Sequence, residues 1–198
     1  MNAHTRRVDP VPSWAVASLR AGLSLIDGER IRHELCRAGI ARRYRDMRGI
    51  AFGCPDVSPA DYGTFRQVLL DCGVSLIPPG LSTGGAESRH AGAVVVGHYH
   101  AGFHMRAARA LLGWTSGDAS SLPDSGLSCG QLALMEASPR DTHIHALASI
   151  YSAAGVSIIG PTERGPGNVS FGVWAPVEIL EPAAGRAALL RLRGDQHD

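Results

Sequence analysis

The stretch DYGTFRQVLLDCGVSLIPPG, residues 61–80, predicts a helix followed directly by a strand. Residues 61–72 place four apolar side chains on one helical face, and Gly73 is a typical helix stop. Residues 74–77 are apolar and extended, and two prolines and a glycine end them. This order, helix and then short apolar strand, is typical of an α/β protein. The apolar face consists of Phe65, Val68, Leu69 and Cys72.

The same alternation continues on both sides of this stretch. We expect a helix or a strand with a turn at 15–26, helices at 28–43, 101–112, 128–137 and 142–154, a loop at 114–126, and short strands at 48–53 and 156–159. Residues 93–96 could form either a strand or a helix, and residues 169–193 contain two strand-like runs. We therefore predict an α/β fold, a mixed sheet with flanking helices. We find no internal repeat, and we expect an arm at 1–14, one domain over 15–194 and a tail at 195–198.

The composition limits the classes of function. The chain has 198 residues, 44% hydrophobic and 19% charged, which suits one compact domain. Its net charge of +1 gives no strong field for nucleic acid or anionic lipid. No apolar run is long enough for a transmembrane helix, and the polar N-terminus does not resemble a signal peptide, so we expect a cytoplasmic protein. All 19 basic residues are arginine, which excludes Schiff-base catalysis by lysine.

Histidine gives the strongest local signal for chemistry. His98, His100 and His104 lie in GHYHAGFH, and two more histidines lie in THIH, residues 142–145. On a helix His100 and His104 share a face and could bind one divalent ion such as zinc, whereas on a strand His98 and His100 would share a face. Alternatively, His104 acts as a general acid or base without metal, or these histidines are hydrogen-bonded or solvated residues at helix starts.

Cys129 and Ser125 are the candidate nucleophiles. Cys129 follows Ser128, a natural N-cap, so the positive end of the helix dipole would lower the pKa of its thiol. The alternative is a small buried residue at a helix start. Ser125 lies in an Asp-Ser-Gly turn that could present a nucleophile, although any surface turn has the same pattern. Cys36 and Cys72 lie on apolar helix faces and are expected in the core.

Several segments, in order, resemble the N-terminal half of a β-ketoacyl synthase, a family with the thiolase-like fold. RGIAFG (48–53) resembles a strand of that family, HAGFHMRAARALLG (100–113) a helix ending in Leu-Gly, SGLSCGQLALMEA (125–137) the nucleophile helix, and EPAAGRAALLRLR (181–193) a later strand. The resemblance implies a thiolase-like half in which Cys129, or Ser125 by spacing, is nearest the acyl-accepting residue. The family's catalytic histidines come from its second half, so the resemblance implies an ancillary or non-catalytic partner.

Three functions follow as hypotheses. The first is a ketosynthase-like protein that handles acyl thioesters, or a non-catalytic partner, in a fatty-acid-like or polyketide-like pathway. It would work with an acyl carrier protein or a ketosynthase, as a homo- or heterodimer. The second is a small hydrolase or lyase with a divalent metal at His98, His100 and His104. The third is a non-enzymatic binding or assembly protein. Only the second implies a cofactor, and none implies a nucleic-acid or membrane partner.

Overall fold

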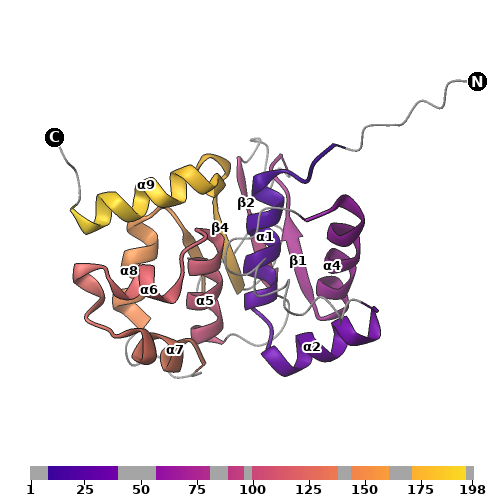
Figure 1. The fold of residues 1–198 in the computed structure, drawn as a ribbon, viewed down its shortest axis with the longest axis horizontal. Coiled ribbons are helices and arrows are strands. Elements are labelled where there is room, and N and C mark those ends of the chain that lie inside the picture. The colour runs from indigo at the N-terminus through magenta and orange to yellow at the C-terminus, as the bar shows by residue number, and fades with distance from the viewer. Residues whose placement is uncertain are drawn as a thin grey trace, which may run out of the picture.

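Four strands form a single sheet in the order β1-β2-β4-β3 (Figure 1). A computed structural model describes residues 9–39, 57–80, 89–95, 100–137, 144–160 and 171–194. The strands are β1 (Val74–Ile77), β2 (His90–Val95), β3 (Ser157–Ile159) and β4 (Phe171–Pro176). All three pairings between them are antiparallel. The expected α/β class is confirmed, but the parallel component of a mixed sheet is wrong for the described strands. The strand predicted at 48–53 lies outside the described residues.

Helices make up most of the rest of the described chain. They are α1 (Ser13–Ser24), α2 (Gly28–Arg37), α4 (Pro59–Asp71), α5 (Ala101–Leu111), α6 (Ser116–Ser120), α7 (Cys129–Ala137), α8 (Ile144–Ala153) and α9 (Pro182–Arg193). Two 3₁₀ turns, η2 (Pro123–Ser125) and η4 (Val177–Leu180), join them. The helix α6 and the turn η2 occupy the region expected to be a loop. Among the described residues no helix has the length and apolar character needed to cross a membrane.

The last predicted strand is a helix. Residues 182–193 form α9, although RAALLRLR was expected to be extended. The run has no β-branched residue and consists of alanine, leucine and arginine, the strongest helix formers. Pro182 occupies the first helical turn, where a missing N–H costs nothing, and Gly194 ends the helix with a φ of 74°. Local propensity therefore outweighs the weak alternation of apolar residues.

Two helix-hairpin units repeat in tandem along the chain, although we found no repeat in the sequence. The first is α4-β1-β2 and the second is α8-β3-β4. Each helix is followed by a glycine in the left-handed region, Gly73 with a φ of 83° and Gly155 with a φ of 93°. The next four residues are VSLI in one unit and VSII in the other. The sequence likeness is only a few residues long, which explains why pattern reading missed it.

The two units meet symmetrically through β2 and β4. Ala93 pairs with Val173 at the centre, Gly92 lies opposite Trp174, and Gly172 lies opposite Val94. Both glycines are required by the close approach of the strands. A Cβ on Gly92 would lie 2.1 Å from the carbonyl oxygen of Val173, and one on Gly172 would lie 2.6 Å from that of Ala93. The register therefore places corresponding residues about a local two-fold axis.

Helices α1 and α5 pack against each other over this sheet (Figure 1). Helix α1 contacts β1 and β2, and α5 contacts β3 and β4, so the pair follows the same two-fold arrangement. Small side chains from these helices and strands lie in one hydrophobic core, where they allow the helices to pack closely on the sheet. This arrangement fixes the positions of the polar side chains that α1 and α5 carry. The small core residues include Ala17, Ala21, Ala91, Ala93, Ala107 and Ala108.

Candidate functional site

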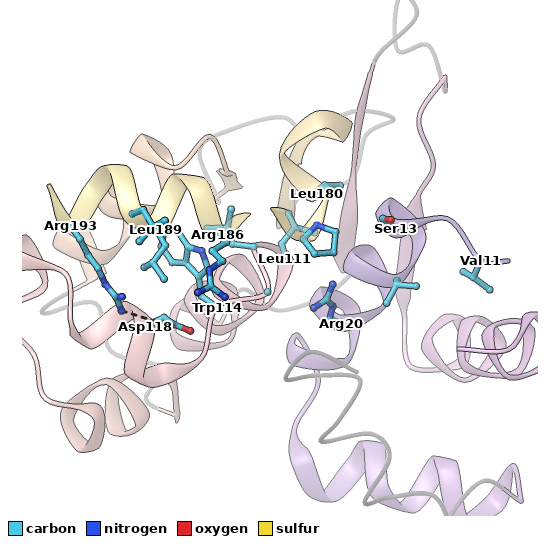
Figure 2. A pocket seen from close by; sticks show the side chains of 15 residues that line it. Val11, Ser13, Arg20, Leu111, Trp114, Asp118, Leu180, Arg186, Leu189 and Arg193 are labelled. Carbon is cyan, nitrogen blue, oxygen red and sulfur yellow. Dashed lines mark hydrogen bonds and ion pairs between the residues drawn. The ribbon is translucent and has the colours of Figure 1, made fainter. Parts of the chain in front are cut away.

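A pocket of about 470 Å³ opens between α1, the end of α5, and α9 (Figure 2). Ligand pockets in proteins span about 300–1,000 Å³, so this volume suits a small organic molecule. The pocket is lined by apolar side chains together with three arginines and one aspartate. Its apolar walls include Val11, Val16, Leu111, Leu180 and Leu189, and its charged residues are Arg20, Asp118, Arg186 and Arg193.

Arg20 is the most unusual residue of the pocket. It projects from α1 and is only 8% exposed. Its Nε has no hydrogen-bond partner, and the guanidinium makes no ion pair within the described part of the chain. Burial lowers the pKa of this guanidinium, but arginine remains charged at neutral pH. An uncompensated positive charge therefore lies in the pocket wall.

Arg106, on the neighbouring helix α5, is an arginine whose guanidinium does have hydrogen-bond partners. It projects from α5 toward the C-terminal end of α1. Its Nε donates to the carbonyl of Ser24 at 3.0 Å, and its Nη2 donates to the carbonyls of Ser24 at 2.7 Å and Ile26 at 2.9 Å. Arg106 therefore holds orphan carbonyls at a helix end. Arg20 approaches the corresponding end of α5, near Gly113, without any such bond.

The other two arginines of the pocket also differ in whether a described residue pairs with them. Arg193 forms an ion pair with Asp118 at 3.4 Å, and its Nε donates to the hydroxyl of Ser121 at 3.0 Å. Figure 2 shows this pair at one end of the pocket. Arg186 is exposed on α9 and makes no hydrogen bond or ion pair with the described residues. Of the three lining arginines, Arg20 and Arg186 thus have no counter-charge among the described residues, although only Arg20 is buried.

The wall that α9 forms is anchored to the end of α5. The indole N–H of Trp114 donates to the carbonyl of Gly185 at 2.8 Å. Gly185 is required there, because a Cβ would lie 2.4 Å from the carbonyl oxygen of Leu112.

Sequence reasoning missed this pocket. A signal was present, because Arg20 is the one charged residue in the apolar run AVASLRAGLSLI, residues 15–26.

The histidines lie elsewhere. His100 is the N-cap of α5, not a helical residue; its Nδ1 accepts from the backbone N–H of Phe103 at 3.1 Å. His104 is 1% exposed, and its Nδ1 lies 2.8 Å from the carbonyl of His100. Burial lowers the pKa of both imidazoles. His98 lies outside the described residues, and the described ones contain no group of three His, Cys, Asp or Glu suited to a metal. The metal site stays a prediction.

Neither candidate nucleophile lines this pocket. Cys129 begins α7, is exposed, and has its Sγ 3.0 Å from the hydroxyl of Ser120. Ser125 is buried, and its hydroxyl donates to the carbonyl of Ser120 at 3.0 Å, which serves the turn. Cys72 is buried as expected, but Cys36 is exposed. Cys36 follows the buried face of α2 by one residue, so its side chain points about 100° away from that face.

A buried ion pair joins α5 to α7, and sequence reasoning missed it too. Arg109 donates to the carboxylate of Glu136 through Nε at 2.6 Å and Nη2 at 2.7 Å, and through Nη1 to the carbonyl of Trp114 at 2.9 Å. Burial opposes its charge, but the bonds to Glu136 raise the pKa of Arg109. The fully buried hydroxyl of Tyr151 has no hydrogen-bond partner within the described ranges. Because every oxygen of Glu136 is used, this pair has a structural role.

Comparison of the chain with protein-family models, with curated proteins and with solved structures gives no match.

Proposed function

We propose that this protein binds a small organic acid in the pocket between α1, α5 and α9. The observation that carries the proposal is Arg20, a buried guanidinium that faces the pocket and has no partner among the described residues. A buried charge is costly unless a counter-charge compensates it. A carboxylate bound at Arg20 would compensate this charge and would accept two parallel hydrogen bonds from the guanidinium.

The surroundings of Arg20 also suit an organic anion. Ser13 and Val11 place the start of α1 at the pocket, and its N-cap, Pro12, offers no side-chain acceptor. The positive end of the α1 dipole therefore reinforces the positive charge. The apolar side chains of Leu111 and Leu189 would contact the hydrocarbon part of the acid. Non-enzymatic binding of such a ligand belongs to the third class expected from the sequence.

Calorimetric titration with hexanoate tests this proposal. We expect hexanoate to bind, the uncharged analogue hexanamide to bind much more weakly, and Arg20→Gln to lower the affinity for hexanoate about tenfold or more. The matched control is Arg32→Gln, which removes an equal charge from the exposed face of α2, a helix that contributes no residue to the pocket. Circular dichroism checks that each variant is folded. Equal binding of hexanoate by Arg20→Gln and the unaltered protein would refute the proposal.

A second proposed function is the transfer of acyl groups from thioesters to Cys129. It is supported by the exposed position of this thiol at the first residue of α7. The thiolate would attack the thioester carbonyl and release the free thiol of the donor. Incubation with a short acyl-CoA, followed by peptide mass spectrometry, measures acylation. Cys36 is also exposed and serves as the internal control, so acylation of Cys129 at no more than the rate of Cys36 would contradict this function.

A further inference from the structure

We propose that the organic acid has two carboxylates, held by Arg20 and Arg186 at separate places in the pocket. This inference rests on the proposed function and names the chemical class of the ligand, an elongated dicarboxylic acid with an apolar middle. In this inference Arg186 is the residue that selects a dicarboxylate over a monocarboxylate. Arg20 would bind one end of the ligand in either case.

The charges in the pocket favour two negative groups. Asp118 is the acidic lining residue, and it is already paired with Arg193. Arg20 and Arg186 remain without a counter-charge among the described residues. A monocarboxylate would compensate only one of the two. A dicarboxylate compensates both and leaves the pocket close to neutral.

The positions of the two arginines favour separated groups. Arg20 projects from α1 and Arg186 from α9, on two walls of the pocket (Figure 2). Along α9 the pocket extends from Pro182 to Arg193, a rise of about 16 Å at 1.5 Å per residue. On α9, Leu189 lies between the lining residues Arg186 and Arg193. The site is therefore elongated, with apolar surface along its length.

The described residues show how a guanidinium of this chain binds a carboxylate. The Arg109–Glu136 pair is bidentate at 2.6 and 2.7 Å, and Arg193 contacts Asp118. The planar fork of a guanidinium matches the two oxygens of a carboxylate. We therefore assign carboxylates to both ends of the ligand.

The test titrates the full chain with α,ω-dicarboxylates from succinate to sebacate and with monocarboxylates of equal carbon number. At the best chain length we expect the dicarboxylate to bind about three- to tenfold more tightly than its monocarboxylate. Arg186→Gln should remove this preference and leave the affinity for the monocarboxylate unchanged. Two identical ends also give a statistical advantage, but it cancels when the ratio of Kd values is compared between the variant and the unaltered protein.

The control variant is Arg191→Gln on the same helix. Arg191 is exposed, is not a lining residue, and donates to the carbonyl of Ala153 at 3.2 Å. It should keep the preference for the dicarboxylate. If both classes of acid bind but Arg186→Gln keeps the preference, or no preference exists at any length, the inference is wrong and the proposed function stands. If neither class binds, the proposed function fails as well.

Discussion

Arg20 and Arg106 each reach the C-terminal end of the other's helix, but only Arg106 is hydrogen-bonded there. Arg106 binds the carbonyls of Ser24 and Ile26. Arg20 lies beside Gly113, with its Nη1 3.2 Å from the place of a Cβ on that residue, and its guanidinium has no hydrogen-bond partner in the part of the chain that the structure describes. Two arginines in matching places on paired helices thus differ in function. One stabilises the fold, and the other leaves its hydrogen-bonding groups available to a ligand.

Arg20→Met should stabilise the protein without ligand. The substitution keeps much of the side-chain volume and removes a buried charge that nothing compensates, so we expect the free energy of unfolding to rise by about 1–2 kcal/mol. Urea denaturation followed by circular dichroism measures the change. The same variant should lose hexanoate binding. A clear loss of stability would show that Arg20 supports the fold rather than a ligand.

Arg106→Met should have the opposite effect on stability. It would leave the buried carbonyls of Ser24 and Ile26 without their donors, which costs about 1–3 kcal/mol. The measurement is the same urea denaturation, so the two variants form a matched pair. Equal effects of the two substitutions would contradict the distinction between them.

Glu136→Ala should destabilise the protein by about 3–5 kcal/mol, because it leaves the buried guanidinium of Arg109 without its counter-charge. Denaturant unfolding measures the loss. The double variant Arg109→Leu, Glu136→Leu is the control, since it removes both charges. It should recover most of the stability, and a double variant as unstable as Glu136→Ala would argue against an electrostatic cause.

Local patterns predicted α4, α2 and α5, of which only α5 lines the pocket. The apolar face and glycine stop of 61–72 predicted α4, and the helix predicted from residue 28 is α2, which Asp27 caps through the N–H groups of Glu29 and Arg30. Gly113 likewise follows α5. These features depend on neighbours in the chain, which is why the sequence reveals them.

The pocket depends on contacts between distant segments, and the sequence alone did not predict it. Arg20 and Arg186 meet at one pocket only because α9 is a helix that packs on the end of α5 through Trp114. The sequence interpretation made this segment a strand. It also emphasised the histidines, whose clustering in the chain is obvious, whereas Arg20 is a single charge in an apolar run. Lack of a partner is a property of the folded state, so no local pattern shows it.

The stability of the protein should fall as the pH falls below the unfolded pKa of histidine, 6.5. Burial lowers the pKa of His104 in the folded state, so the unfolded chain takes up a proton at a higher pH than the native protein. The contribution is fully present above pH 6.5 and is lost from there downward toward the lower folded pKa. Urea denaturation at a series of pH values measures it. His104→Leu should flatten the dependence, and an unchanged slope would assign it to other groups.

Gly92→Ala should destabilise the sheet at its centre of symmetry. The added Cβ would lie 2.1 Å from the carbonyl oxygen of Val173 and 2.7 Å from the Cα of Trp174, both of which are backbone atoms that cannot rotate away. Overpacking of this kind costs about 1–3 kcal/mol, and forced separation of β2 from β4 would disturb both repeats. Gly28→Ala is the control, because nothing lies within 4 Å of a Cβ at that position. Thermal unfolding compares the two variants, and a Gly92→Ala protein as stable as Gly28→Ala would disprove the close pairing of β2 with β4.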